Sequence, residues 1–256
     1  MKYLAMIQAR CGSSRLPNKV LSKFGNKTDL EWVIDRVSRS HLIDEVMVVT
    51  SIEKNNLPII RLCAENGVRV FAGSEDDVLD RFYQASKLLV PEYIVRITAD
   101  CPLFDWSYLD MALNRMDNSI DYLCESDNQF PDGLDLEVVK FSVLQQIWQD
   151  AEMLSEREHV TLYIRNHAEM FNIVKIDCPV SGIGHMRWTL DEEEDYILIS
   201  KIYDHFLRMG TEDFLTDDIL EFLSEHPEME KINNMYSRNE GLAKSLMFDR
   251  LVGKCK

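Results

Sequence analysis

Basic residues are scarce in this sequence of 256 residues: 28 Lys and Arg stand against 44 Asp and Glu, which gives a formal net charge of −16. Nucleic acids and anionic membranes attract cations, so this balance argues against both as general partners. It leaves room for a small basic pocket inside an acidic shell. With 46% hydrophobic and 28% charged residues, the composition is that of a globular protein and excludes a largely disordered chain.

Long apolar runs and paired cysteines are also lacking. No stretch of 18 apolar residues occurs, so no transmembrane helix is expected. The six cysteines form no C-x-x-C pair and no Cys/His cluster at zinc spacing, which favours free thiols in a reducing compartment. The first apolar run stops at Arg10 and is too short for a signal peptide, so we expect a cytoplasmic protein.

No internal repeat, low-complexity tract or Pro/Ser-rich linker divides the chain. In the first 100 residues, short apolar runs alternate with longer amphipathic ones. Strands are predicted at residues 3–8, 45–50, 68–71 and 93–98, and helices at 30–38, 57–66 and 76–89. This alternation predicts an α/β fold with a doubly wound, mostly parallel sheet.

The pattern is looser after residue 120. Strands are predicted at 121–125, 134–141, 172–177 and 187–190, and helices at 142–153, 156–166, 191–209 and 216–225. We therefore expect one domain over residues 1–256 that carries an inserted hairpin or helical arm.

The loop after the first predicted strand is rich in cations for so acidic a chain. Arg10, Arg15 and Lys19 lie within ten residues, beside the small residues Gly12–Ser14. Ligands of open α/β sheets bind where strands end, and backbone N–H groups there can line a phosphate. Neither a Walker A motif nor G-x-G-x-x-G is present, and the alternative is an exposed basic turn.

Residues 7–21 read I-Q-A-R-C-G-S-S-R-L-P-N-K-V-L. They resemble the opening motif of the cytidylyltransferase family of 3-deoxy-manno-octulosonate and acylneuraminate cytidylyltransferases, above all its spore coat polysaccharide biosynthesis protein F branch. The resemblance implies a fold like that of nucleotide-diphospho-sugar transferases and a loop that grips the triphosphate of CTP. The nucleotide-binding residues expected in this loop are Arg10, Gly12, Ser13, Ser14, Arg15 and Lys19.

Residues 72–82, A-G-S-E-D-D-V-L-D-R-F, resemble a second motif of that branch. By the resemblance, Ser74 and Arg81 contact the nucleotide. The alternative for Arg81 is an i,i+4 ion pair with Asp77 on a helix surface.

Two aspartates are candidates for a metal site. Asp100 directly follows a predicted buried strand, and a carboxylate there suits Mg²⁺, which binds one or two carboxylates together with phosphate oxygens and water. In R-W-T-L-D-E-E-E-D-Y, which resembles a late motif of the family, Asp191 falls on the second metal-binding aspartate. The alternatives are a capping role for Asp100 before Pro102 and an acidic helix start at Asp191.

Two further segments resemble the branch, P-D-G-L-D-L-E-V at 131–138 and R-E-H-V-T at 157–161. By the resemblance they line the side of the cleft that holds the acceptor. The expected acceptor-binding residues are Asp132, Asp135, Glu137, Arg157, His159 and Arg187. Alternatively, Asp135 and Glu137 form the metal motif of a glycosyltransferase, and Arg157 and His159 support a helix.

These residues predict a nucleotidyltransferase that uses CTP and Mg²⁺, with Lys19, Arg10 and Asp100 as catalytic residues. The expected acceptor is an acidic sugar of the octulosonic or nonulosonic type, or a related phosphorylated molecule, for a surface polysaccharide. The resemblance also implies a homodimer formed through an arm within residues 134–176. A metal-dependent glycosyltransferase and a non-catalytic nucleotide-binding protein are the alternatives.

Overall fold

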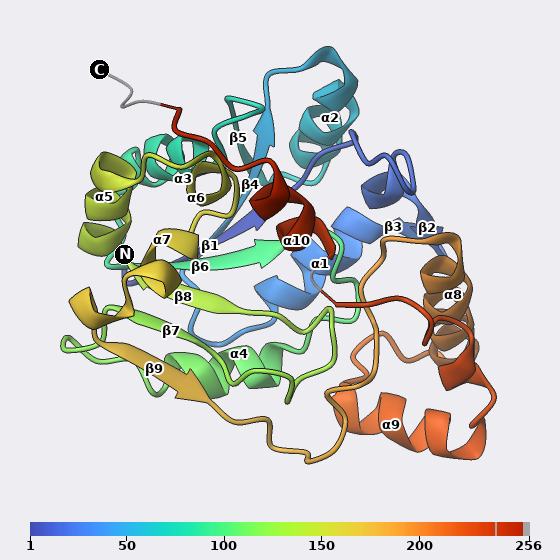
Figure 1. Ribbon diagram of the computed structural model, residues 1–256. Coiled ribbons are helices and arrows are strands. Elements are labelled where there is room, and N and C mark those ends of the chain that lie inside the picture. Colours follow the sequence, from blue (N-terminus) through green and yellow to red (C-terminus); the bar gives the residue numbers. More distant parts are fainter. Residues whose placement is uncertain (239, 253–256) are drawn as a thin grey trace.

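The computed structural model describes residues 1–238 and 240–252. Its main strands are β1 (Tyr3–Gln8), β4 (Glu45–Ser51), β5 (Arg69–Gly73), β6 (Tyr93–Thr98), β7 (Tyr122–Glu125), β8 (Glu137–Lys140) and β9 (Ile173–Ile176). They form one sheet in the spatial order β5-β4-β1-β6-β8-β7-β9 (Figure 1). A separate short hairpin pairs β2 (Lys23–Phe24) with β3 (Lys27–Thr28).

Neighbouring strands of the sheet are parallel except for β8, which runs antiparallel to β6 and β7. The predicted mostly parallel sheet is thereby confirmed. From β1 the chain winds outward through β4 and β5 and then returns to the other side of β1 with β6. Ligands of such sheets bind at this reversal, outside the carboxyl ends of the strands.

Helices cover both faces of the sheet (Figure 1). In chain order they are α1 (Asp29–Ser38), α2 (Leu57–Glu65), α3 (Val78–Lys87), α4 (Trp106–Leu113), α5 (Phe141–Asp150), α6 (Leu154–Glu158), α7 (Leu162–Asn166), α8 (Glu193–Arg208), α9 (Thr216–Glu225) and α10 (Glu240–Met247). In the described part of the chain, no helix is both long and apolar enough to cross a membrane.

The sheet separates two buried apolar clusters. Successive residues of a strand point to opposite faces, so Tyr3, Ala5 and Ile7 of β1 join the cluster beneath α1, α2, α4, α8 and α9. Leu4 and Met6 join the cluster beneath α3, α5 and α7. Because both faces are covered, the central strands are apolar throughout, as the runs at 3–8 and 45–50 predicted.

Most predicted elements occur within a few residues of their expected bounds, but the strand expected at residues 187–190 is wrong. Only Arg187 pairs there, through a single parallel bridge to Asp132. The helix expected at 156–166 is split into α6 and α7, because Val160 between them has a φ of 47°, which no helix accommodates.

The expected dimerisation arm, residues 134–176, packs against the chain's own sheet. Val143, Leu144 and Ile147 of α5, together with Val160, belong to the apolar cluster that contains Leu4. Packing within the chain therefore accounts for these apolar side chains.

After α9 the chain crosses back to the other end of the molecule, and α10 lies beside α6 (Figure 1). Beyond α10, the backbone N–H of Leu154 donates to the carbonyl of Arg250, and that of Val252 donates to the carbonyl of Glu152. Asp249 accepts hydrogen bonds from the backbone and side chain of Ser155. These contacts fix the segment that follows α10 against the residues at the start of α6.

Candidate active site

A cleft of about 870 Å³ opens where β1 and β6 end. It begins at Gln8 and Thr98, the last residues of these strands, and extends to His159 after α6 and to Ser245 of α10. It lies at the edge of the sheet where the strand order reverses, which is the expected place for a ligand.

The ammonium of Lys19 lies between two carboxylates at the entrance to this cleft. Its Nζ is 2.6 Å from Asp100 Oδ2 and 2.5 Å from Asp191 Oδ1, and the lysine is only 8% exposed. The loop before it turns at Asn18, which has a φ of 59°, and Lys19 then opens a single 3-10 turn. Three segments far apart in sequence thus meet at one cation.

This pairing changes how both partners ionise. Burial would raise the pKa of Asp100, but Lys19 outweighs that effect and holds the pKa at about 2. Burial would likewise favour neutral Lys19, but the charges of Asp100 and Asp191 raise the pKa of the lysine above its ordinary value. Lys19 and Asp100 therefore keep their charges at neutral pH.

The same two carboxylates fit a divalent cation, because they already hold one cationic centre between them. Among the residues that the structure describes, no group of three or more His, Cys, Asp or Glu is arranged to hold a metal. A metal here would take its remaining ligands from phosphate oxygens and water, which is how Mg²⁺ is commonly bound in nucleotide sites.

The other cations of the first loop face the same cleft. Arg15 pairs with Asp191 at 2.7 Å and with Glu192 at 3.2 Å, whereas Arg10 lies 3.4 Å from Glu75 and is half exposed. The backbone N–H of Cys11 donates to the buried Asn56, which anchors the loop at 2.8 Å. The expected nucleotide-binding residues that line the cleft are Arg10, Gly12, Ser13, Ser14, Arg15 and Lys19.

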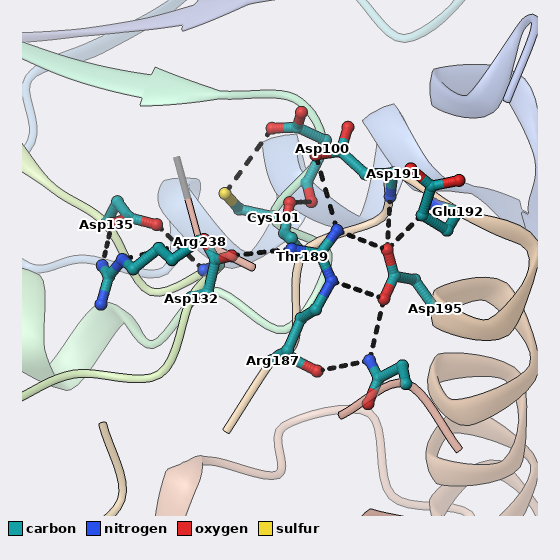
Figure 2. Close-up of polar contacts among 12 residues, drawn as sticks. Asp100, Cys101, Asp132, Asp135, Arg187, Thr189, Asp191, Glu192, Asp195 and Arg238 are labelled. Atoms are coloured by element: carbon teal, nitrogen blue, oxygen red, sulfur yellow. Dashed lines mark hydrogen bonds and ion pairs between the residues drawn. The ribbon is translucent and has the colours of Figure 1, made fainter. Parts of the chain in front are cut away.

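Asp191 is positioned by a buried ion pair behind it. The fully buried Asp195 accepts hydrogen bonds from Arg187 Nε and Nη2 and from the backbone N–H groups of Asp191 and Glu192, all at 2.9 Å (Figure 2). Arg187 Nη1 also donates to Asp132 at 2.9 Å. Arg187 thus links Asp195, in the first turn of α8, to Asp132, in the segment before β8.

Three carboxyl groups gather around Arg238, which also lines the cleft. Its Nη2 pairs with Asp135, as Figure 2 shows, and its Nη1 donates to the carbonyl of Phe130 at 2.9 Å. Burial and the charge of Asp135 raise the pKa of Asp132 to about 6. Burial and the same charge raise the pKa of Glu125 to about 8. Glu125 is therefore mostly protonated and uncharged at pH 7, whereas Asp132 is mostly ionised.

Glu137 lies in the wall of the cleft and is almost fully buried. Arg96 of β6 and Arg165 of α7 each reach it at 2.5 Å, from opposite sides. Burial would raise the pKa of Glu137, but the two guanidinium groups outweigh it and lower the pKa well below the ordinary value.

Ser74, Arg81 and Arg157 are not among the residues that line the main cleft. Buried Arg81 donates to the carbonyls of Ser74 and Glu75 at 2.9 and 3.1 Å, so it supports that loop instead of pairing with Asp77. Arg157 is directed at Asp77, 2.6 Å away, and at the carbonyl of Trp148. Of these three residues, Arg81 lines a smaller adjoining pocket that also includes Arg10.

Sequence reasoning missed several lining residues. Arg96, Glu125, Arg165 and Arg238 belong to no motif quoted for the acceptor, yet all four line the cleft. Arg96 carried the one usable signal, because it is a cation inside an otherwise apolar predicted strand. The others depend on contacts between distant segments.

Comparisons with known proteins identify the family of this chain. The family model described as cytidylyltransferase matches residues 4–238. An uncharacterized protein of Methanocaldococcus jannaschii is 38% identical over 91% of this chain and 95% of its own length. The spore coat polysaccharide biosynthesis protein SpsF of Bacillus subtilis is 35% identical over 78% of this chain and 85% of its own.

Two further matches differ in how much of the chain they cover. The solved structure of a cytidylyltransferase from Leptospira borgpetersenii superposes with a TM-score of 0.86 at 30% identity, and covers 93% of this chain and 100% of that one. The 3-deoxy-manno-octulosonate cytidylyltransferase of Geobacter sulfurreducens is 30% identical over only 44% of either chain. The chain belongs to the cytidylyltransferase family and is a nucleotidyltransferase.

Proposed function

We propose that this enzyme transfers a cytidylyl group from CTP to an acidic sugar or a related phosphorylated acceptor and releases pyrophosphate. The observation that carries the proposal is the Lys19 ammonium between Asp100 and Asp191, beside a loop of cations at the carboxyl edge of the sheet. Cations that converge on a cleft in a chain of net charge −16 fit a polyphosphate ligand.

In the proposed reaction, Arg10, Arg15 and Lys19 bind the triphosphate and stabilise the charge that develops on the departing pyrophosphate. The acceptor hydroxyl loses its proton to solvent and its oxygen attacks the α-phosphorus, while the bond from the α-phosphorus to the bridging oxygen breaks and that oxygen leaves with the pyrophosphate. Reactions of this kind depend mainly on positioning and on charge neutralisation. The ion pair of Arg187 with Asp195 maintains the place of Asp191 throughout.

Asp100 and Asp191 are the proposed ligands of Mg²⁺. When bound, the ion neutralises phosphate charge and lowers the pKa of the acceptor hydroxyl. Lys19 occupies the space between the two carboxylates, so an ion held by both would require its ammonium to turn toward a phosphate of the nucleotide. The name of the Bacillus relative supports a polysaccharide precursor as acceptor, and that of the Geobacter relative supports a sugar acid.

The test is pyrophosphate release from CTP and Mg²⁺ with a panel of sugar acids and sugar phosphates. Asp100→Asn should lower kcat by about 10²–10³-fold, as loss of one transition-state contact does in other enzymes. Glu221→Gln, on the far helix α9, is the matched control and should retain full activity. Unchanged turnover in Asp100→Asn would contradict the role of this residue.

A metal-dependent glycosyltransferase is less consistent with the contacts. Asp135 pairs with Arg238, whereas Glu137 pairs with Arg96 and Arg165, so the two acids are each neutralised by separate cations. A glycosyltransferase releases a nucleoside diphosphate instead of pyrophosphate, and assaying both products separates the two activities. Tight CTP binding by calorimetry without turnover on any acceptor would support a non-catalytic protein.

We also propose that residues 1–256 act as one cytoplasmic domain that forms a homodimer through residues 134–176. The five cysteines that the structure describes are free, which is compatible with a reducing compartment. Sedimentation at micromolar concentration tests the dimer, and a monomer would refute it.

A further inference from the structure

Two arginines from different elements converge on one buried carboxylate inside the cleft. Arg96 of β6 and Arg165 of α7 hold the opposite oxygens of Glu137, whose side chain is 4% exposed. Arg96 is also held by Gln8 at 3.2 Å, so its guanidinium is fixed from both neighbouring strands. The position of these cations is set before any ligand binds.

Both carboxylate oxygens of Glu137 already have partners within the protein. Besides the two arginines, the hydroxyl groups of Thr161 and Tyr122 donate to it. One negative charge thus faces two guanidinium groups, so Arg96, Arg165 and Glu137 together carry one positive charge. An anionic ligand would balance it.

Two buried nitrogens beside this pair have no hydrogen-bond partner among the described residues. They are Nε of Arg96 and Nε2 of His159, and both residues line the cleft. A buried donor without a partner costs stability, about 1–3 kcal/mol, so proteins retain such donors mainly where a ligand or water satisfies them. Burial lowers the pKa of His159, the charge of Glu158 at 3.9 Å from Nε2 opposes this, and the charges of Arg96 and Arg165 add to the lowering.

Arg96 and Glu137 lie further back along the sheet than Asp100. Arg96 stands directly opposite Glu137 on the neighbouring strand, two residues before the end of β6. Two strand residues span about 7 Å, and Asp100 lies another two residues further along. Arg96 therefore lies four residues before Asp100, and an anion held beside Glu137 is offset along the sheet from the oxygen attacked beside Asp100.

We propose that Arg96, Arg165 and His159 form a subsite for a phosphate monoester on the acceptor, remote from its attacking oxygen. These two guanidinium groups and one imidazole line the same part of the cleft, and guanidinium groups match the charge and geometry of the terminal oxygens of a phosphate. That this phosphate belongs to the acceptor rests on the proposed function; the subsite itself does not.

The match to octulosonate enzymes is consistent with a different acceptor. The Geobacter enzyme aligns with only 44% of this chain, whereas the Methanocaldococcus relative aligns with 91%. Likeness to the octulosonate enzymes therefore does not specify the acceptor of this chain.

The experiment compares 3-deoxy-manno-octulosonate with its 8-phosphate as probes, by calorimetry and by NMR of protein labelled with ¹³C in its histidine rings. We expect the 8-phosphate to bind at least ten times more tightly and to raise the pKa of His159, since a dianion stabilises the charged ring. Arg165→Gln should abolish the difference between the probes, and Arg165→Lys should restore part of it. Arg165 is half exposed, so these variants are expected to fold.

Two control variants localise the effect. Arg208→Gln changes an exposed arginine on α8, and Arg15→Gln changes the other cationic site, so both should keep the preference for the 8-phosphate. Equal affinity for the two probes, or a preference that Arg165→Gln retains, overturns the subsite. A preference that Arg165→Gln abolishes, without pyrophosphate release from CTP, supports the subsite and refutes the proposed function.

Discussion

Replacing Lys19 with methionine removes the cation between Asp100 and Asp191 and keeps a side chain of similar length. Breaking a buried ion pair from one side typically costs about 3–5 kcal/mol in the free energy of unfolding. The shift in the pKa of Asp100 from 3.8 to about 2 accounts for roughly 2–3 kcal/mol of this, at about 1.4 kcal/mol per pKa unit. We therefore expect Lys19→Met to lower the free energy of unfolding by about 3–5 kcal/mol at pH 7.

The pH dependence of this loss has a definite sign. Because folding lowers the pKa of Asp100, its contribution is present above pH 4 and is lost as the pH falls toward 2. Because folding raises the pKa of Lys19, its contribution is lost only above the ordinary lysine range. The difference in stability between wild type and Lys19→Met should therefore be constant from about pH 5 to pH 9 and should shrink in acid.

A divalent cation should replace the missing ammonium. Mn²⁺ should raise the melting temperature of Lys19→Met more than that of the wild type, because two unpaired carboxylates now face each other. Lys27→Met is the matched control, since Lys27 also lies between two acids, Asp35 and Glu212, but near the surface. It should cost less than about 1 kcal/mol and gain nothing from Mn²⁺. Equal responses of the two variants to Mn²⁺ would refute the reasoning.

Two other substitutions test features near the site. Asp29 is fully buried, and its carboxyl oxygens have no hydrogen-bond partner among the described residues. Burial and the charge of Asp100 raise the pKa of Asp29, so the free energy of unfolding falls as the pH rises above 4. Asp29→Asn should stabilise the protein by about 1–3 kcal/mol at pH 8 and by less at pH 4, as measured by urea unfolding; no gain at pH 8 would contradict this. Gly133 has a φ of +106°, and a Cβ there would lie 2.5 Å from the nitrogen of Thr189, so Gly133→Ala should cost more than about 2 kcal/mol. Gly67→Ala, at φ +67° with nothing within 4 Å, should cost only about 1 kcal/mol, and similar losses in both variants would argue against the close contact.

The sheet could be predicted because its strands carry local signals. The apolar run at 93–98 and the turn with Gly12 and Pro17 after residue 8 follow from residue types in sequence, and the strands of the main sheet lie within a few residues of their predicted runs. The strand expected at 187–190 was wrong because its apolar residues, Trp188 and Leu190, are buried by packing instead of by pairing in the sheet. Burial alone does not distinguish the two.

The contacts within the candidate site were harder to predict from the sequence. Three separate motifs predicted that Lys19, Asp100 and Asp191 belong to one site. Only the fold shows that the lysine lies between the two acids. Arg157 stands in a motif and yet binds Asp77, because the reach of an arginine side chain lets it serve either a ligand or a loop. Such choices depend on partners that lie 80 or more residues away, as Asp77 does from Arg157.

The cleft is lined from Gln8 to Ser245, so its walls join parts of the chain separated by most of its length. Contacts between such distant parts form late, since the entropy of closing long loops opposes them until much of the chain is ordered. A partly folded protein can therefore contain β1, β4 and β6 and still have no complete cleft. Recovery of nucleotide binding during refolding would then follow recovery of helical signal, and binding would report the completed fold.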